Sequence, residues 1–447
     1  MSSLDQHYLE FRDKTAGVFS AFPQLEPMRH VIFKEILAKG ETPAWIESIK
    51  RWVRPVVRRP IRTGILQPAD VLVLVETTRE VVVDSLLPVC RELARSQIST
   101  QIVALRCSES FPGTVYRIEP ACSPFAPRWC SEAWFALAAL EPALRDREAR
   151  RGFWHAASFA ESRLQEISHV LDVVRPKVVL SAASNLAGGA ALVVEARYRG
   201  ITSMLLQHGI PQIFYTPILD DLILAWGETS CATLRQLGTS ARKLLPVGSP
   251  RHDHMVGIDR NVSRSQMLAK LGLADRRTLC FFSNGNDLVR NGDGPLHCAR
   301  WLETAASRFD GRLNVIVRLH PNEDGSLYKN CPHLRVTKGV PDLSTTLAGS
   351  DIVASLCSTA LDEALLFHGS VWHFESEGWP ALADNWRTGR AVRIASENQL
   401  CELIAQSFSE PCPRSGLGNT VHQVFANHGR AAQAAAAAVI ERLSCCV

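Results

Sequence analysis

Short runs of apolar, mostly β-branched residues alternate along this chain with segments of helical character, and this alternation constrains the fold more than any other feature. Residues 70–76 read Asp-Val-Leu-Val-Leu-Val-Glu, a continuous apolar run that is typical of a strand buried on both faces of a parallel sheet. A helical stretch at 81–95 and a second apolar run at 100–105 follow it. Strand, helix and strand in this order indicate a βαβ unit.

The same alternation resumes after residue 160 and continues through the second half of the chain. Further strands are expected at 177–180, 202–206, 221–225, 244–247, 278–282, 313–317, 334–336, 351–354 and 371–374. Helices are expected between them, notably at 161–174, 184–198, 297–308 and 359–366, and an Ala-rich helix at 430–443 closes the chain. Residues 108–160 interrupt the pattern and are predicted to form an insertion with helices around 132–151.

A chain of 447 residues is too long for one compact core, so we predict two domains. The fold class is α/β, with two Rossmann-like domains that face a central cleft, an N-terminal extension and a helical insertion. The predicted bounds are 1–68 for the extension, 69–245 for the first domain, 246–430 for the second, and 431–447 for the C-terminal helix and tail.

Composition and charge limit the cellular setting and the partners. The thirteen cysteines include no CxxC pair, which favours reduced thiols in a cytoplasmic protein. No stretch approaches 18 uninterrupted apolar residues, and the polar N-terminus is unlike a signal peptide. The formal net charge of +4 is small for this length, so nucleic acid is not an expected partner.

Basic residues alternate with Trp, Val and Ile at 45–62, and two interpretations of this segment stay open. It could make peripheral contact with the anionic inner face of the cytoplasmic membrane. It could equally be a linker that packs its apolar side on the domain and exposes its arginines to water. Pro55 and Pro60 exclude a long helix in either case.

The strand expected at 202–206 runs into Gln207-His208-Gly209. This places the imidazole of His208 at the carboxyl end of a parallel sheet, where open α/β sheets bind ligands. A histidine that titrates near neutral pH suits a general base, although a core histidine beside a turn is the competing interpretation. A reaction that retains configuration would need a carboxylate nucleophile instead. Glu228 is the first candidate for that role, and Asp221 and Asp253 follow.

The second half offers polar residues after three predicted strands. Because the carboxyl ends of parallel strands meet at one edge, these residues should converge on one anion-binding rim. The candidates are Ser283, Asn284, Gly285, Arg318, His320, Ser358, Thr359 and Glu363. The competing interpretation is that Ser358 and Thr359 only cap a helix and that Glu363 serves a local hydrogen bond.

Several common cofactor and metal signatures are absent from the sequence. It contains no GxxxxGK[ST] or GxGxxG motif, and it has no HExxH or other compact zinc signature. We therefore expect no bound metal and no cofactor, with any nucleotide entering as part of the substrate.

At this point the motifs resemble a family. The matching stretches are Gln207-His208-Gly209-Ile210-Pro211, Trp226-Gly227-Glu228, residues 247–253, Arg318-Leu319-His320-Pro321 and residues 358–364. Over residues 170–375 they resemble the bacterial GT-B glycosyltransferases of surface-polysaccharide assembly, the enzymes of capsule and lipopolysaccharide. The His-Pro and Ser-Thr pairs resemble those of CMP-sugar-using sialyl-, polysialyl- and Kdo transferases. That resemblance implies that His320, Ser358 and Thr359 hold the CMP phosphate.

The resemblance departs from that group at one place, where its acidic motif matches Gln207-His208-Gly209 and no carboxylate is present. A His-Gly pair there resembles the CDP-glycerol glycerophosphotransferases, in which the histidine is the presumed base. The leading prediction is a glycosyltransferase that moves a CMP-activated acidic sugar, such as Kdo or sialic acid, to a glycan or lipid-linked glycan acceptor. The alternatives are a CDP-glycerol-type polyol-phosphate transferase and a UDP-sugar 2-epimerase, with a non-catalytic nucleotide-binding subunit as a third.

Overall fold

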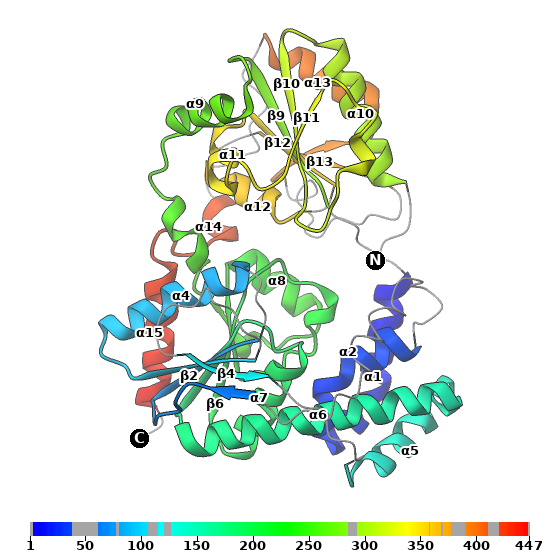
Figure 1. The fold of residues 1–447 in the computed structure, drawn as a ribbon, viewed down its shortest axis with the longest axis vertical. Helices are drawn as coiled ribbons and strands as arrows, with labels where there is room; N and C mark the ends of the chain where they lie inside the picture. Colours follow the sequence, from blue (N-terminus) through cyan, green and yellow to red (C-terminus); the bar gives the residue numbers. More distant parts are fainter. Residues whose placement is uncertain are drawn as a thin grey trace. The chain divides into compact units, whose positions relative to one another are not determined.

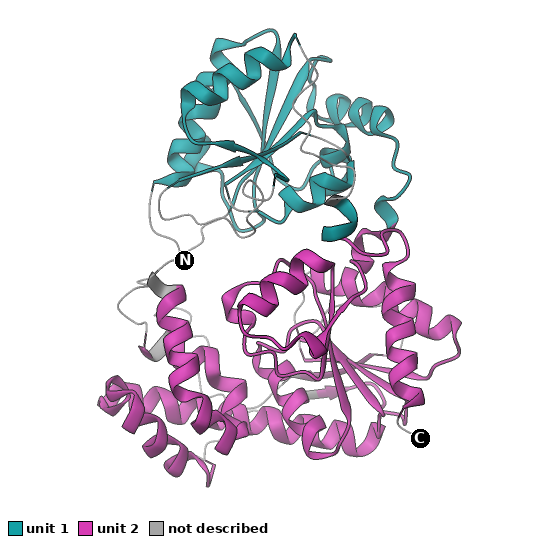
Figure 2. Ribbon diagram, turned by 180° about the vertical axis from the view of Figure 1, so that it is seen from behind, with its two compact units in different colours: residues 1–2, 254–424 teal, residues 3–253, 425–447 magenta. Residues whose placement is uncertain are grey.

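The computed structural model describes residues 3–37, 61–76, 80–105, 115–119, 127–284, 293–356, 358–367, 370–376, 389–409 and 420–445. The chain forms two compact units (Figure 2). Unit 1 comprises residues 1–2 and 254–424, and unit 2 comprises residues 3–253 and 425–447. The division falls between Asp253 and His254, whereas the sequence placed it between 245 and 246, and the C-terminal helix joins unit 2.

Unit 2 is built on an eight-stranded sheet of order β1-β4-β3-β2-β5-β6-β7-β8. The strands are β1 (Ile61–Thr63), β2 (Val71–Val75), β3 (Thr100–Ala104), β4 (Val115–Glu119), β5 (Val178–Ser181), β6 (Thr202–Leu206), β7 (Leu222–Ala225) and β8 (Leu244–Pro246). All neighbours are parallel except β1 and β4, which pair antiparallel.

The β2 strand shows why a continuous apolar run folds here. Val71, Val73 and Val75 point into a core with α4 (Glu80–Arg95) and α15 (Ala431–Ser444), while Leu72 and Leu74 point into the opposite core with α6 (Arg147–Val174) and α7 (Ala187–Tyr198). All five side chains are buried. Burial of each removes about 1.5–3 kcal/mol of unfavourable hydration, so both faces of the sheet must be covered.

The N-terminal residues form part of unit 2 rather than a separate extension. The helices α1 (Ser3–Ala21), η1 (Pro23–Met28), α2 (Arg29–Val31) and η2 (Ile32–Leu37) lie near α6 in Figure 1. Tyr8 and Phe33 pack their rings against Phe214, which precedes β7. Residues 38–60, which hold most of the proposed membrane-contact segment, lie outside the described residues. Arg62 at its end pairs with Glu166, with 3.0 Å between Nη2 and Oε1.

The helical insertion is present and differs in extent from the prediction. It contains α5 (Cys130–Leu140), the 3-10 turn η4 (Pro142–Arg145) and α6. The helix α6 spans 28 residues and begins at the Asp146 cap, which accepts backbone N–H groups of Glu148 and Ala149. The region predicted to hold helices around 132–151 forms α5, η4 and the start of α6, and α6 continues through the helix predicted at 161–174. No helix among the described residues has the length and apolar character needed to cross a bilayer.

Unit 1 contains a six-stranded, fully parallel sheet of order β11-β10-β9-β12-β13-β14. The strands are β9 (Arg277–Phe282), β10 (Leu313–Arg318), β11 (Leu334–Thr337), β12 (Ile352–Ser355), β13 (Ser370–Phe374) and β14 (Val392–Ile394). The helices are α9 (Arg260–Leu271), α10 (Gly294–Arg308), α11 (Leu343–Gly349), α12 (Ala360–Ala364), α13 (Glu397–Ser407) and α14 (Thr420–Val424). The prediction of two Rossmann-like α/β domains is confirmed.

The C-terminal segment is held on unit 2 by residues of 226–228 and 247–253. The carboxylate of Asp253 accepts the backbone N–H groups of Ala431 (2.9 Å) and Ala432 (2.8 Å), which caps α15. The carbonyl of Trp226 accepts the N–H of Ala426 at 2.7 Å. Gly248 has a φ of +99°, and a Cβ there would lie 2.0 Å from the Ala426 carbonyl oxygen, so only glycine allows this approach.

Candidate functional site

His208 follows β6 at the carboxyl edge of the unit 2 sheet, as the sequence predicted. Its ring is half-buried, and Nε2 lies 3.3 Å from the hydroxyl of Tyr215. Tyr215 belongs to η5 (Ile213–Tyr215) and also packs its ring against the imidazole, with 5.8 Å between centroids. The turn that Gly209 and Pro211 introduce therefore brings a phenol onto the imidazole. Sequence reasoning missed Tyr215, because nothing in the local pattern shows that the chain folds back.

Gln207 fixes the strand end from which His208 projects. Its side-chain oxygen accepts the N–H of Trp226 at 2.7 Å, and its side-chain nitrogen donates to Gly209 O (2.8 Å) and Ser230 Oγ (2.9 Å). The indole of Trp226 donates back to the Gln207 carbonyl at 2.9 Å. These hydrogen bonds connect the ends of β6 and β7, and they fix the backbone from which His208 projects.

The three candidate carboxylates of unit 2 are not brought together. Glu228 is exposed at the start of α8 (Glu228–Gln236), after the carboxyl end of β7, with its carboxylate 3.6 Å from Arg235. Asp221 lies at the amino end of β7, where its carboxylate accepts the N–H and hydroxyl of Ser203 at 2.9 Å each. Asp253 is occupied by the α15 cap, and burial raises its pKa despite these hydrogen bonds. Glu228 and Asp253 both follow carboxyl ends of strands, the edge at which His208 lies, and Asp221 lies at the opposite edge.

A carboxylate that sequence reasoning missed fills the Gly-rich start of α7. Glu76, directly after β2, accepts the N–H of Gly188 on Oε1 and the N–H of Gly189 on Oε2, both at 2.7 Å. A Cβ on Gly189 would lie 2.0 Å from the backbone carbonyl oxygen of Ala183, so only glycine fits at this position. A helix N-terminus attracts anions, and here the protein supplies its own. The rule that found His208, a polar residue at a strand end, would also have found Glu76.

In unit 1, the candidate residues do follow neighbouring parallel strands. The strands β10, β9 and β12 are adjacent in the sheet, and their register aligns Arg318 with Phe282 and Phe282 with Ser355. The segments that begin at Ser283, Leu319 and Leu356 therefore leave the sheet at the same edge. Gly285 lies outside the described residues.

His320 is exposed on this rim and its backbone is held by two buried side chains. Its N–H donates to Ser283 Oγ at 2.8 Å and to Glu323 Oε2 at 3.0 Å, and the Ser283 hydroxyl also donates to Glu323. The ring Nδ1 accepts the N–H of Asn322 at 3.2 Å. In the neutral imidazole the proton is therefore on Nε2, which makes that nitrogen a hydrogen-bond donor. Ser283 positions His320, and Glu323 is a further residue that the sequence analysis missed.

The guanidinium of Arg318 is engaged by the segment between β11 and α11 and by α11 itself. Its Nη1 donates to the carbonyl of Pro341 and, at 3.2 Å, to Thr346 Oγ1 beside α11. Burial lowers its pKa, and the charge of Asp342 acts in the opposite direction. Arg318 therefore joins β10 to α11.

The remaining candidates lie beside β12. Asn284 Oδ1 accepts the hydroxyl of Ser355 at 3.3 Å, which ties the ends of β9 and β12. Ser358 and Thr359 are half-buried, and Ser358 Oγ accepts the N–H of Ala360 at 3.2 Å, the geometry of a helix cap. Glu363 is buried in α12, only 2 % exposed, so it supports the helix rather than presenting a carboxylate at the surface. His320, Ser358 and Thr359 remain as the accessible polar groups of the candidate nucleotide site.

Metal ligands are a separate question. Among the described residues, no three His, Cys, Asp or Glu side chains gather as they would around a metal ion.

Comparisons with known proteins bear on the fold. No family model and no curated protein matches the sequence. Solved structures do match: MnaA from S. aureus with UDP has a TM-score of 0.54 and 11% identity, covering 81% of this chain and 93% of that chain. The UDP-GlcNAc 2-epimerase from Neisseria meningitidis, bound to UDP-GlcNAc, has a TM-score of 0.54 and 13% identity, covering 83% of this chain and 99% of that one. The wall teichoic acid polymerase TagF, soaked with CDPG, has a TM-score of 0.50 and 11% identity over 85% and 90%.

These similarities, at such low identity, show a shared fold. The chain has the GT-B-like architecture of two Rossmann-like domains found in UDP-GlcNAc 2-epimerases and in TagF. This confirms the fold expected from the resemblance. The structures named above contain UDP, UDP-GlcNAc or CDPG, and a CMP-linked acidic sugar receives no support from them.

Proposed function

We propose that this protein is an enzyme that acts on a nucleotide-activated sugar or polyol, with the nucleotide held by unit 1 and His208 of unit 2 as the acid–base group. The observation that carries the proposal is His208 itself, a half-buried imidazole at a strand end with a phenol 3.3 Å from Nε2. The GT-B-like fold shared with enzymes that bind UDP-GlcNAc or CDPG supports it.

Unit 1 contributes hydrogen-bond donors suited to a phosphate. His320 carries its ring proton on Nε2 when neutral, and the Ser358 and Thr359 hydroxyls follow the neighbouring rim strand β12. A histidine and two hydroxyls bind a phosphate through directed hydrogen bonds, which in a partly dry site are worth about 1.5–3 kcal/mol each.

Transfer to a hydroxyl requires one base that removes one proton, and His208 can supply it. When the acceptor hydroxyl attacks the donor, the imidazole takes its proton and the nucleotide leaves with the electrons of the broken bond. Tyr215 restricts the orientation of the ring through its hydroxyl and its ring contact. Such a base accelerates the reaction by roughly 10²–10⁴-fold.

Epimerisation next to an anomeric carbon makes a different demand, because a proton must leave one face of the sugar and return to the other. Two acid–base groups at one place suit that reaction better than one. In the described part of the unit 2 rim, Glu76 is engaged by two backbone N–H groups and Glu228 is exposed beside Arg235. We therefore place a CDP-glycerol-type transferase first. A UDP-sugar 2-epimerase is second, favoured by the similarity to solved epimerases.

Product analysis separates the candidates. The purified protein is incubated with CDP-glycerol, with UDP-GlcNAc and with a CMP-linked acidic sugar, each without acceptor. A transferase is expected to release CMP slowly from CDP-glycerol by transfer of glycerol phosphate to water, and to release it faster once a hydroxyl acceptor is added. An epimerase would produce UDP-ManNAc or its hydrolysis products from UDP-GlcNAc, and that result would favour the epimerase over the transferase. Release of CMP from the CMP-linked acidic sugar, with CDP-glycerol left intact, would restore the CMP-sugar prediction.

Two variants test the role of His208. His208→Ala should lower turnover by roughly 10²–10⁴-fold and leave nucleotide affinity unchanged, because the base acts only in the transition state. Tyr215→Phe keeps the ring contact and should lower turnover far less. Normal kinetics in a His208→Ala protein that melts earlier would show that the histidine only supports the core.

A further inference from the structure

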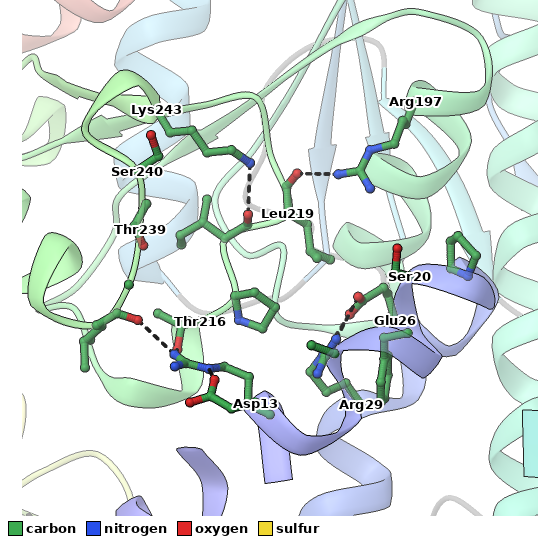
Figure 3. Close-up of a pocket in the computed structure, with 18 residues that line it drawn as sticks. Asp13, Ser20, Glu26, Arg29, Arg197, Thr216, Leu219, Thr239, Ser240 and Lys243 are labelled. Carbon is green, nitrogen blue, oxygen red and sulfur yellow. Dashed lines mark hydrogen bonds and ion pairs between the residues drawn. The ribbon is translucent and has the colours of Figure 1, made fainter. Parts of the chain in front are cut away.

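A separate cavity of about 540 Å³ lies within unit 2 (Figure 3). One wall is formed by α1 and η1, and the other by the segments that precede β7 and β8, residues 216–219 and 237–243. Since these segments enter β7 and β8, the cavity lies at the amino edge of the sheet. His208 follows the carboxyl end of β6, at the opposite edge. The cavity is therefore distinct from the candidate site around His208.

Four cationic side chains line this cavity, and two of them have carboxylate partners. Arg12 pairs with Asp13 at 2.8 Å. Arg29 is 5 % exposed, pairs with Glu26 through two 2.8 Å hydrogen bonds, and stacks its guanidinium 3.6 Å from the Phe19 ring centroid. Each of these two ion pairs has a net charge close to zero, and both pairs form part of the cavity wall.

The other two cations bond only to main-chain carbonyls among the described residues. Arg197 Nη2 donates to Leu219 O at 2.9 Å, and Lys243 Nζ donates to Ile218 O (3.2 Å) and Asp220 O (2.6 Å). Figure 3 shows both side chains reaching the 218–220 segment from opposite sides. Neither forms an ion pair with a carboxylate in the described part of the chain.

Burial disfavours the charged form of the Lys243 ammonium and lowers its pKa. The charges of Asp220 and Asp221 raise the pKa in partial compensation, and the nearby charge of Arg197 lowers it by the smallest amount. Burial raises the pKa of Asp220 to about 6, so this carboxylate is charged at neutral pH and loses its charge in acid. An anion placed between the two cations would favour the charged ammonium and relieve the repulsion from Arg197.

The rest of the lining suits a hydroxylated molecule. Thr239, Ser240 and Ser20 bring hydroxyl groups to the cavity, and Pro217 and Leu219 contribute apolar surface. Small-molecule pockets commonly measure about 300–1,000 Å³ and combine apolar walls with a few polar groups.

We propose that this cavity binds a small anionic, polyhydroxylated molecule, of the size and chemistry of a sugar monophosphate, with Arg197 and Lys243 at its anionic group. The two cations are anchored by backbone carbonyls, so their positions are set before the ligand arrives. This site is additional to the proposed nucleotide site of unit 1 and does not depend on it.

Calorimetry with three probes tests the proposal: glucose 6-phosphate, inorganic phosphate and glucose. Glucose 6-phosphate should bind most tightly, phosphate more weakly, and glucose not at all in the millimolar range. Arg197→Gln and Lys243→Gln should each weaken glucose 6-phosphate binding by about tenfold or more, the loss expected for one charge-assisted hydrogen bond. Arg242→Gln, next to Lys243 but outside the cavity lining, should leave the affinity within about twofold of wild type.

The controls separate this site from the nucleotide site. His320→Ala should not change glucose 6-phosphate affinity, and nucleotide affinity should survive Arg197→Gln, which also shows that the variant is folded. Because Arg197 is exposed, its variant keeps the test valid if Lys243→Gln unfolds. Wild-type affinity in Arg197→Gln, equal binding of glucose, or phosphate binding as tight as glucose 6-phosphate would each overturn the proposal.

Discussion

Replacing Glu76 by alanine should open an anion site at the start of α7 and destabilise unit 2. The wild-type carboxylate satisfies the backbone N–H groups of Gly188 and Gly189 at 2.7 Å each. Hydrogen bonds to a charged group contribute about 1.5–3 kcal/mol each, and loss of a single neutral helix cap costs about 0.5–2 kcal/mol. Glu76 is only half-buried, so water recovers part of the loss, and we expect about 2–4 kcal/mol in total.

For a unit of this size each kcal/mol shifts the melting temperature by about 2–4 °C, so Glu76→Ala should melt about 5–15 °C below wild type. The assay is thermal unfolding followed by circular dichroism. Asp84→Ala, an exposed carboxylate on α4, is the matched control and should melt with the wild type.

Sulfate rescue tests the mechanism behind that loss. Sulfate is excluded from protein surfaces, so replacing chloride by sulfate at constant ionic strength stabilises most proteins. The stabilisation of wild type and of Asp84→Ala measures this nonspecific effect. In Glu76→Ala, sulfate should also bind the vacated N–H groups and restore about 1 kcal/mol beyond this nonspecific effect. A melting temperature within about a degree of wild type, or a sulfate effect equal in all three proteins, would refute this account.

Three further predictions follow from single contacts. His320→Ala should raise the dissociation constant of the preferred nucleotide by about 10–150-fold in calorimetry, while His333→Ala, an exposed histidine of the same unit, should not. Burial raises the pKa of Asp220 to about 6, so its contribution to stability is present below about pH 4 and is lost as the pH rises through 6. In urea unfolding, the free energy of unfolding of Asp220→Asn relative to that of wild type should therefore rise by on the order of 3 kcal/mol between pH 4 and 8. Gly248→Ala should cost about 2–4 kcal/mol through its clash with Ala426, whereas Gly200→Ala, at positive φ in open space, should cost about 1 kcal/mol.

The strands could be predicted because their signal is local. A continuous run such as 70–76 fits only a strand buried on both faces, and every strand that the sequence predicted appears in the structure. The strands that escaped prediction are β1, β4 and β14, short segments that contain Arg62, Arg117 and Arg393; β1 and β14 lie at sheet edges, and β4 lies between β1 and β3. A charged residue within three to five residues leaves no continuous apolar run, so these segments carry little hydrophobic signal.

The direction of a side chain at a strand end could not be predicted. His320 and Arg318 leave the same strand two residues apart, yet one is exposed on the rim and the other is bonded to Pro341 and Thr346. A parallel sheet places successive side chains on opposite faces, but which long side chain finds a tertiary partner depends on helices far along the sequence. The sequence therefore located the rim of unit 1 and could not separate its binding residues from its packing residues.

The position of Asp253 gives the resemblance to glycosyltransferases a structural meaning. The stretches 226–228 and 247–253 contributed to that resemblance, and in the structure Trp226, Gly248 and Asp253 hold the C-terminal segment through a carbonyl, a close approach and a helix cap. Each of these contacts restricts which residue type fits at its position, and none of them involves a substrate. A chain that keeps this docking arrangement will keep these motifs whether its donor carries CMP, CDP or UDP. These two motifs therefore support the fold and do not distinguish among donors, so the donor must be identified by testing the proposed roles of His208 and His320.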